Sequence, residues 1–397
     1  MLRILSLSTL FPSPARSGFG RFVANQMRTV AQTGSIDLVM INPIGVPPWP
    51  LSTREPYRTL ATCPAQSELG GITVHHPRVT LIPVVGGDSN PGRIVRAVWP
   101  LVCRLHAERP FDLIDAQFFF PDGPVAAEIA RRLGLPLTIK ARGSDIHYWG
   151  TRPRALAQIR KAGDAAARLL TVSAALGRDM AALGLPPARI TPHYTGLDRD
   201  RFRVIPRAEA RAALPGILPL ALPADAPLLV TPGALIAIKG QALAIEALTH
   251  LPAAHLALAG TGPDEAALRA QAARLGLSDR VHVLGQVSHD ALPVLMAAAD
   301  AVVLPSEREG LANVWIEALA CGAPLVIPDI GGAREVVTNP GAGQIAARTP
   351  EAIAQALAAL LANPPSQTAV AASAAGFSWQ ANAQKLIAIW AQAAARA

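Results

Sequence analysis

The sequence predicts an α/β protein of two doubly wound domains, each a largely parallel sheet wrapped by helices. Its 397 residues are long for one core, and two domains of roughly 200 residues each are the expected division. Short β-branched or Leu-rich runs alternate with Ala-rich helical stretches along the chain, which is typical of a parallel sheet with helical crossovers. Residues 203–227 carry five prolines, a linker composition that places the domain boundary near residue 200. We therefore expect domains over 1–200 and 201–375.

The strand candidates follow one another in both halves of the chain. In the first half they are residues 3–9, 36–42, 79–84, 113–118, 137–143, 168–173 and 189–194. In the second half they are residues 228–235, 255–260, 280–285, 301–306 and 324–330. The Pro-rich stretch 42–64 is expected to form a long loop. Ligands of doubly wound sheets bind outside the carboxyl ends of the strands, so functional motifs should follow strands, and two such domains facing each other would create a cleft.

Composition excludes several classes of protein. Hydrophobic residues make up 51% of the chain, yet no apolar run reaches the length of a membrane span. The apolar start of the chain is broken by Ser, Thr and Pro within about ten residues, which favours a first strand and loop over a secretory signal. The three cysteines are far apart and lack C-x-x-C spacing, so neither a disulfide framework nor a zinc site is indicated. A reducing cytoplasm is expected.

The excess of positive charge is confined to the first half of the chain. Residues 1–200 hold 23 Lys and Arg against 14 Asp and Glu, whereas residues 201–397 hold 13 against 14. This asymmetry indicates that the first half meets an anionic partner. Nucleic acid is disfavoured because no basic run is interleaved with aromatic residues, which leaves anionic lipid or a phosphate-bearing substrate. Residues 92–109 alternate Arg with apolar side chains and could lie on a membrane surface or form a core helix broken at Pro100.

Two glycine-containing turns follow strands of the second half. Gly233 comes directly after a strand and Lys239 precedes a helix, so this backbone and cation could approach a phosphate, or Lys239 could be a solvated residue of an ordinary turn. Gly260 and Gly262 fit the start of a dinucleotide fingerprint, but Glu265 occupies the third glycine position. An NAD site is therefore not expected, and the turn either packs structurally or approaches another ligand.

The stretch 307–317, EREGLANVWIE, places two carboxylates eight positions apart. In one continuous helix Glu309 and Glu317 would lie about 80° apart around the axis. If the helix instead begins near Ala312, Glu309 precedes it and Glu317 lies on its second turn. The N–H groups of residues 311–313 would then form an anion site. Because carboxylates repel an anion, the two Glu side chains would accept hydrogen bonds from hydroxyls on either side, for example from a ribose and a hexose; otherwise they are simple helix-flanking acids.

Three further motifs follow strands. Residues 329–335, DIGGARE, suit a close approach at a helix start, and residues 17–21, SGFGR, follow the first strand. Residues 140–147, KARGSDIH, follow the fifth. Within it Asp145 is either a helix cap or a catalytic group, and His147 could contact a sugar hydroxyl. The remaining candidates His75, His76 and His193 are expected to be structural or surface residues.

Together these motifs resemble the family 4 glycosyltransferases, retaining sugar transferases of the GT-B architecture with two Rossmann-like domains facing across a cleft. The resemblance covers essentially the whole chain. It rests on GALIAIKG, AGTGPDEAAL, RVHVLGQV, YTGLDRDRF and residues 306–337, with the pair Glu309 and Glu317 as its most diagnostic element. Residues 376–390 resemble the closing helix of that family, which implies that 376–397 cross back to the N-terminal domain.

The resemblance implies a role for each matching residue. Glu317 would bind the nucleotide ribose, Glu309 the hydroxyls of the donor sugar, and Lys239 the diphosphate. The implied catalytic set is Glu309, Lys239, Arg142 and Asp145. The implied donor-binding set is Gly233, Lys239, Gly260, Gly262, Val283, Glu309, Gly310, Leu311, Ala312, Asn313 and Glu317. The implied acceptor and diphosphate loop is Gly18, Phe19, Gly20 and His147.

Two departures from the family pattern concern charge. Many members carry Arg where this chain has Ala234, so the diphosphate would depend more on Lys239 and on an Arg of the first domain. Many also carry a His in HGxD where this chain has Arg142, which could face the diphosphate or an acceptor phosphate.

The implied reaction moves a sugar from a UDP- or GDP-sugar to a glycan or lipid-linked acceptor in cell-surface polysaccharide synthesis. The second domain would bind the donor and the first the acceptor, without cofactor or metal, and the chain has no Asp-x-Asp motif. A phosphate-bearing or lipid-linked acceptor at the inner face of the cytoplasmic membrane would suit the basic first half. The alternatives are a GT-B sugar-nucleotide epimerase or hydrolase and a non-catalytic partner subunit that binds nucleotide sugar.

Overall fold

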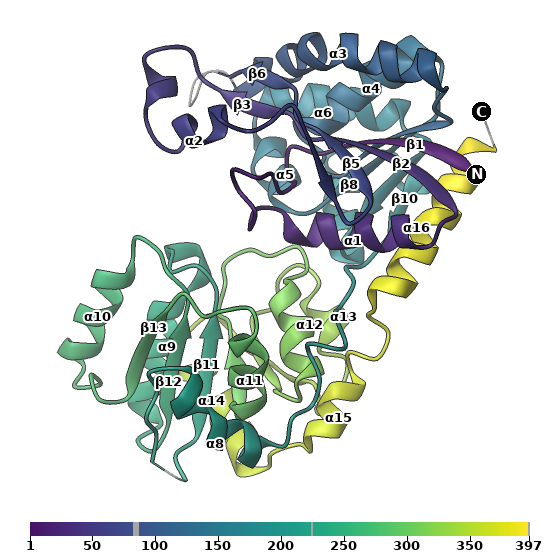
Figure 1. The fold of residues 1–397 in the computed structure, drawn as a ribbon. Helices are drawn as coiled ribbons and strands as arrows, with labels where there is room; N and C mark the ends of the chain where they lie inside the picture. Colours follow the sequence, from purple (N-terminus) through teal and green to yellow (C-terminus); the bar gives the residue numbers. More distant parts are fainter. Residues whose placement is uncertain (82–86, 224, 396–397) are drawn as a thin grey trace. The chain divides into compact units, whose positions relative to one another are not determined.

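The computed structural model describes residues 1–81, 87–223 and 225–395, which form two compact units. Unit 1 comprises Met1–Gly196 and Trp379–Ala397, and unit 2 comprises Leu197–Ser378 (Figure 1). The change from one unit to the other at residue 197 lies close to the expected boundary at 200. The last helix of the chain belongs to unit 1.

Unit 1 is built on a mainly parallel sheet. Within the described residues its strand order is β10-β9-β8-β7-β1-β2-β5-β4, with only β4 antiparallel to its neighbour. Its strands are β1 (Leu2–Leu7), β2 (Ile36–Ile41), β4 (Gln66–Leu69), β5 (Ile72–His75), β7 (Leu113–Ala116), β8 (Leu137–Ala141), β9 (Arg168–Thr171) and β10 (Ile190–Pro192). A separate parallel pair joins β3 (Ile44–Val46) and β6 (Arg78–Thr80).

Helices cover both faces of this sheet. They are α1 (Arg21–Gln32), α2 (Tyr57–Ala61), α3 (Asn90–Glu108), α4 (Asp122–Leu133), α5 (Ser144–His147), α6 (Pro153–Ala165), α7 (Ala174–Ala182) and α16 (Trp379–Ala394). The closing helix α16 packs beside α1, and together they share one apolar cluster that includes Met27, Leu386 and Trp390 (Figure 1). Helices α3, α4 and α6 pack together on the other side of the sheet.

A buried polar network ties α16 to the sheet of unit 1. His193 Nε2 donates to the carbonyl of Asn382 at 2.9 Å, so Nδ1 is free to accept from Lys140 Nζ at 2.7 Å. Trp390 Nε1 donates to Asp115 at 3.1 Å. Burial lowers the pKa of both Lys140 and His193 well below their usual values. His193 is thus a structural residue, as expected from the sequence.

Unit 2 has an entirely parallel sheet in the part of the chain that the structure describes, ordered β13-β12-β11-β14-β15-β16. The strands are β11 (Leu228–Pro232), β12 (His255–Ala259), β13 (Val281–Gly285), β14 (Ala301–Val303), β15 (Leu325–Ile327) and β16 (Gly343–Ile345). The helices are α8 (Arg207–Ile217), α9 (Gln241–Ala247), α10 (Glu265–Arg274), α11 (Ala291–Ala298), α12 (Asn313–Ala320), α13 (Ala333–Val336), α14 (Pro350–Ala362) and α15 (Gln367–Ala372).

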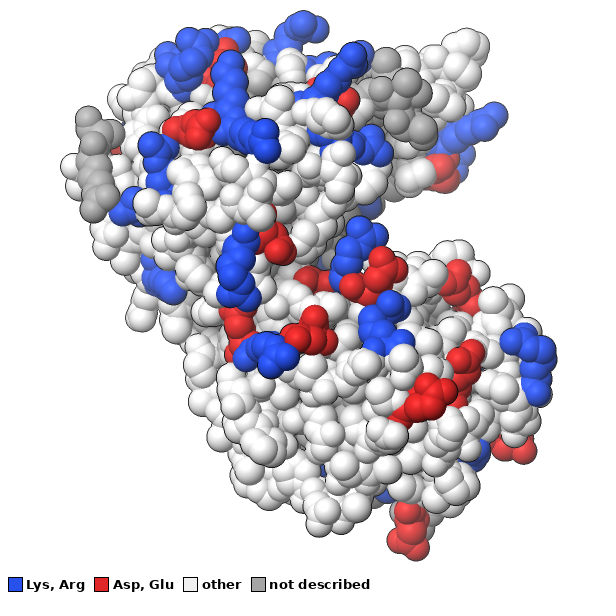
Figure 2. Space-filling view, turned by 180° about the vertical axis from the view of Figure 1, so that it is seen from behind, with Lys and Arg blue, Asp and Glu red and all other residues white. Residues whose placement is uncertain are grey.

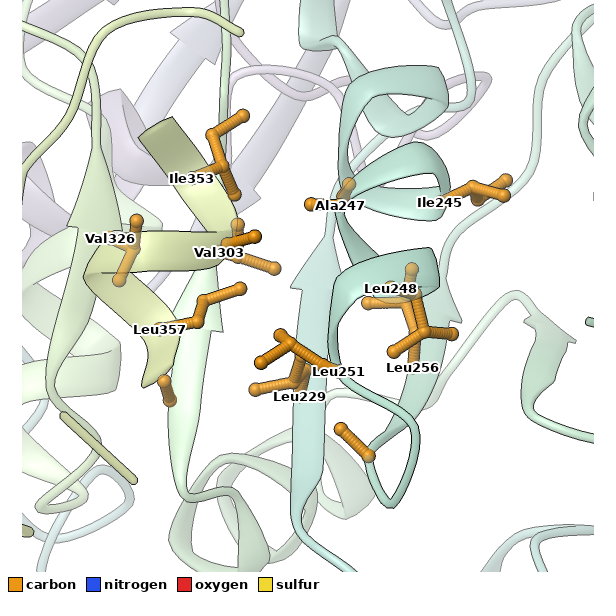
Figure 3. Packing of buried hydrophobic residues seen from close by; sticks show 14 of the residues in the cluster. Leu229, Ile245, Ala247, Leu248, Leu251, Leu256, Val303, Val326, Ile353 and Leu357 are labelled. Atoms are coloured by element: carbon orange, nitrogen blue, oxygen red, sulfur yellow. The ribbon is translucent and has the colours of Figure 1, made fainter. Parts of the chain in front are cut away.

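The core of unit 2 lies between its sheet and helices α9, α10 and α14. Figure 3 shows Leu229 and Leu256 of the sheet packing against Leu248 of the 3-10 turn after α9 and Leu357 of α14. Central strands β11 and β12 are buried along their whole length, as expected for a sheet with helices on both faces. This rigid sheet positions the loops at its carboxyl edge.

Three sequence expectations are corrected by the fold. Helix α3 continues through Pro100, whose exposed position leaves the unpaired carbonyl of Arg96 open to water. The expected linker 203–227 contains α8, which packs on α11 and is anchored by Arg211 Nη2 to Asp300 Oδ2 at 2.6 Å. The expected loop 42–64 contains β3 and α2.

Short strands escaped the sequence analysis. Strands β4, β5 and β16 were not predicted, because each has only three or four residues. The candidate at 79–84 overlaps β6, and its residues 82–84 lie outside the described part of the chain.

Basic side chains gather on the face of unit 1 seen in Figure 2, in keeping with the excess of Lys and Arg in residues 1–200. Among the described helices, none combines the length and apolar character that a bilayer span requires.

Candidate functional site

The lysine loop follows β11, the central strand of unit 2. The chain passes Gly233, forms a 3-10 turn (Ala237–Lys239) and enters α9 after Gly240, which has φ +71°. A Cβ at Gly240 would collide with the backbone oxygen of Pro305, and Glu307 N donates to Ile238 O at 2.7 Å. The lysine loop is therefore held directly against the segment that follows β14.

Lys239 and Glu309 form an ion pair. Lys239 Nζ lies 2.5 Å from Glu309 Oε1, and the two side chains are 26% and 14% exposed. The sequence analysis assigned these residues to the same donor, and the structure brings them into direct contact. The Lys239 ammonium is paired with a carboxylate and is still open to solvent. It can therefore bind an anionic ligand without passing through a buried, unpaired state, which would be costly.

The glycine turn after β12 packs against the lysine loop. A Cβ at Gly260 would collide with Gly233 O, and a Cβ at Gly262 would collide with Leu235 O. Leu235 N also donates to Thr261 O at 3.0 Å. Both glycines are thus required by close backbone contact within the protein, whereas their contact with a donor stays a prediction. Val283, on β13, packs its side chain on the core of unit 2.

Helix α12 begins at Asn313, with Ala312 in an extended conformation as its N-cap, close to the position expected. No side chain caps it and no acidic residue lies in its first turn. Its leading N–H groups, which follow Gly310 and Leu311, are therefore open to an anion. Glu309 lies before this end and Glu317 lies within the helix, so the two acids flank it as predicted.

Glu317 is partly buried on α12. Burial raises its pKa from 4.5 to about 7. In the described part of the chain, no group donates a hydrogen bond to its carboxylate. The Cys321 thiol one turn further on remains neutral, because burial raises its pKa to about 12. The Glu317 carboxylate thus has no hydrogen-bond donor among the described residues, and a pair of ribose hydroxyls would supply such donors.

The glycine pair of residues 329–335 holds the loop of Glu309, a function that sequence reasoning missed. Gly331 has φ +47°, and a Cβ there would collide with Glu309 O. Gly332 N donates to Gly310 O at 2.8 Å. The doubled glycine at a strand end was the available signal, but it was interpreted as an approach to ligand.

Replacement of Gly331 by Ala is expected to lower the free energy of unfolding by about 2–4 kcal/mol, since the new methyl both strains φ and displaces the Glu309 backbone. The matched control is Gly276→Ala, where φ is +68° but nothing lies within 4 Å of the new Cβ. That change should cost only about 1–2 kcal/mol. Urea unfolding measures both, and equal losses would contradict the contact with Glu309.

Arg142 is anchored in unit 1 by Gln117. Its Nε donates to Gln117 O and its Nη2 to Gln117 Oε1, both at 2.7 Å. Gln117, another residue that sequence reasoning missed, directly follows β7, and this position was the available signal. Burial lowers the pKa of Arg142 to about 10, so the guanidinium is charged at neutral pH.

Asp145 is committed to the backbone rather than open to substrate. Its buried carboxylate accepts from Phe119 N at 2.7 Å, Gly143 N at 2.8 Å and Arg142 N at 3.0 Å. Burial raises its pKa. These contacts give it the structural, loop-fixing role that the sequence left open, although Gly143 and not Asp145 is the N-cap of α5. The catalytic role implied for Asp145 stays a prediction.

The other candidates of the first domain contact residues other than Arg142. His147 Nε2 lies 2.9 Å from Asp179 on α7. Gly20 is the left-handed N-cap of α1, packed against the backbone of Leu10. Phe19 is 36% exposed beneath the guanidinium of Arg16, and Gly18 lines a cavity with α1.

The two Rossmann-like units give the chain the GT-B fold. The chain is similar to the sucrose-phosphate synthase of Thermosynechococcus elongatus, with a TM-score of 0.81, 20% identity and full coverage of both chains. It is also similar to Anabaena Alr3699/HepE in complex with UDP, with a TM-score of 0.74 and 20% identity over 99% of this chain and 100% of that one.

Sequence comparisons define the family. The glycosyl transferase 4-like domain matches residues 18–196, and glycosyl transferases group 1 matches residues 219–377. A putative teichuronic acid biosynthesis glycosyltransferase (TuaC) of Bacillus subtilis is 27% identical over 90% of this chain and 88% of its own length. The GDP-mannose-dependent alpha-(1-6)-phosphatidylinositol monomannoside mannosyltransferase of Mycolicibacterium smegmatis is 31% identical over 67% and 72%, and the D-inositol 3-phosphate glycosyltransferase 1 of Catenulispora acidiphila is 30% identical over 72% and 73%. The chain belongs to the family 4 type of GT-B glycosyltransferases and is a glycosyltransferase.

Proposed function

We propose that the protein transfers a sugar from a UDP- or GDP-sugar to a glycan or lipid-linked acceptor in cell-surface polysaccharide or glycolipid synthesis, with retention of the anomeric configuration. The observation that carries this proposal is the Lys239–Glu309 pair beside the uncapped start of α12, with Glu317 on the same helix. A cation and helix N–H groups suit a diphosphate, and the two carboxylates suit hydroxyls on either side of it.

Charge that develops on the leaving diphosphate would be stabilised by Lys239 and by the N–H groups of α12. Preorganised donors of this kind act without reorganisation during the reaction. The new glycosidic bond would form on the face from which the diphosphate leaves. No metal or cofactor has a role in this scheme, and we propose that the reaction is metal-independent.

The relatives support the choice of substrates. One of them is GDP-mannose-dependent and acts on a phosphatidylinositol mannoside, another is named for D-inositol 3-phosphate, and HepE has been solved with UDP and with UDP-glucose. Together with the basic first half of the chain, these names favour a phosphate-bearing acceptor, free or lipid-linked, and in the second case a membrane surface as the place of reaction.

Thermal-shift measurements with UDP-, GDP- and ADP-sugars test the donor site. A sugar nucleotide of the right class at about 100 times its Kd should add about 2.7 kcal/mol of stability. The shift should survive a metal chelator and disappear in Glu317→Ala, because the carboxylate that receives the ribose is lost. Glu209→Ala, an exposed acid on α8, is the control that should keep the shift.

Absence of stabilisation by every sugar nucleotide, in folded protein, would contradict the donor site. Sugar release or epimerisation that is unaffected by any acceptor would favour the hydrolase or epimerase alternative. The anomeric configuration of the product, read from its NMR coupling constants, tests retention.

A further inference from the structure

Unit 1 contains a cavity of about 500 Å³ that the donor site does not use. It lies between one face of α1, the loop after β1 and the hairpin of β4 and β5. Its volume is within the range of about 300–1,000 Å³ typical of small-molecule sites. Its polar lining residues are Ser13, Ser17, Arg21, Asn25, Arg28, Ser67 and Glu68.

The two arginines of the cavity lie on one face of α1. Arg21 and Arg28 are seven positions apart, and Asn25 lies between them on the same stripe. Arg28 Nη2 donates to Asn25 Oδ1 at 2.9 Å, and its side-chain stem packs so closely under the β4–β5 turn that a Cβ at Gly70 would lie 2.7 Å from its Cδ. The stem of Arg28 therefore packs beneath the hairpin, while the residue remains exposed.

Arg21 is exposed at the start of α1, a helix position at which an anion is favoured. It is the first residue of α1, where the helix dipole disfavours a cation, and no acidic residue lies in that first turn. Throughout residues 1–81, 87–223 and 225–395, no group forms a hydrogen bond or ion pair with its guanidinium. A bound anion would supply the missing partner.

Glu68 shares the cavity with both arginines but pairs with neither. Among the described residues, no Lys or Arg nitrogen lies within ion-pair distance of its carboxylate. Opposite charges that line one cavity without meeting leave room for a ligand that carries both an anionic group and hydroxyl donors. A phosphate would accept from Arg21 and Arg28, and hydroxyls would donate to Glu68.

From this arrangement we infer that the cavity between α1 and the β4–β5 hairpin binds a phosphorylated polyol. The inference rests on the proposed function, in which such a group belongs to the acceptor, and it assigns the acceptor's phosphate to named residues. In another cavity of unit 1, of about 640 Å³, two of the three lining arginines, Arg3 and Arg109, are already paired with Asp37.

Calorimetric titration of the full chain at constant ionic strength tests the inference, with inorganic phosphate, glycerol 3-phosphate and D-inositol 3-phosphate as probes. The double variant Arg21→Gln, Arg28→Gln should raise the Kd of each probe at least tenfold, because two charge-assisted contacts are lost. Glu68→Gln should weaken D-inositol 3-phosphate but not inorganic phosphate. The control Arg178→Gln changes an exposed residue of α7 and should bind as the wild type does.

Vesicles distinguish the two sources of the ligand. A lipid-borne group predicts tighter binding to phosphatidylinositol vesicles than to phosphatidylcholine vesicles, lost in the double variant. A soluble acceptor predicts binding of D-inositol 3-phosphate with no preference between the vesicles. Wild-type protein that saturates with none of the probes or vesicles, or a double variant that binds as tightly as the wild type, overturns the inference.

Thermal shift with the sugar nucleotide separates this result from the donor site. The double variant should keep the full shift, because Arg21 and Arg28 take no part in donor binding. Loss of phosphate binding with an intact shift supports the inference, whereas an intact shift with unchanged phosphate binding overturns it and leaves the proposed function standing.

Discussion

Replacement of Lys239 by Ala is expected to lower kcat/KM by about 10²-fold or more, equivalent to about 2.7 kcal/mol of transition-state stabilisation. The reason is that Nζ is held by Glu309 in the loop that leads into α12, where the leaving diphosphate would gain charge, and no other Lys occurs in the second half of the chain before residue 385. Initial rates with the donor identified by thermal shift measure the effect.

Unfolding measurements separate this loss of activity from a loss of stability. The Lys239–Glu309 pair is partly exposed, so either single variant should change the free energy of unfolding by no more than about 1 kcal/mol. Lys161→Ala, an exposed lysine of α6, is the control and should leave the rate unchanged. Wild-type turnover in Lys239→Ala would contradict the assignment of Lys239.

Glu309→Gln tests the other half of the pair. The amide keeps the size of the side chain but removes the charge that holds Lys239, so the rate should fall in this variant as well. If both residues act on one donor, the double variant should lose less than the two single losses combined, since contacting residues are not additive. Full additivity would indicate independent roles.

The sequence predicted where the motifs of unit 2 lie, because its elements repeat one local pattern. Each of the motifs at Gly233, Gly260 and Glu309 follows a buried strand, and the carboxyl ends of parallel strands meet at one edge of a sheet. The start of α12 could be placed from the Gly-Leu-Ala-Asn run before its apolar face. Contact between Lys239 and Glu309 then follows from β11 and β14 being neighbours.

The rest depended on contacts between distant segments, which spacing does not encode. Gly331 packs so closely on the backbone of Glu309 that any side chain would collide with it, and this contact exists only once β15 lies beside β14. In unit 1, Arg142 is held by Gln117 and Asp145 by three N–H groups from two loops, so residue type alone could not distinguish ligand contact from loop fixing. The hairpin of β4 and β5, and with it the cavity over α1, was missed because each strand has only four residues.

Donor binding is expected to release a proton from Glu317. Burial raises the pKa of this group from 4.5 to about 7, and hydroxyl donors would favour the charged carboxylate and lower the pKa again. With a return to the ordinary value, Kd should be about tenfold weaker at pH 6 than at pH 8, where the carboxylate is already charged. Titration calorimetry at pH 6 in buffers of different ionisation enthalpy should report release of about one proton.

In the free protein, the raised pKa of Glu317 makes the folded state less stable as the pH rises. A carboxyl whose pKa is higher in the folded than in the unfolded state contributes stability below its unfolded pKa of 4.5, and this contribution is lost as pH rises toward 7. Glu317→Gln removes the titration, so the stability of the wild type relative to this variant should fall by about 3 kcal/mol between pH 4 and pH 8.

Glu317→Gln also provides the control for binding. Its affinity for the donor should be weaker than that of the wild type at pH 8 and nearly independent of pH, because the amide cannot release a proton. A wild-type affinity that is equal at pH 6 and pH 8 would contradict hydroxyl binding by Glu317. A transition near pH 7 is the one expected of Glu317, whereas Glu309 is already paired with Lys239 before the donor arrives.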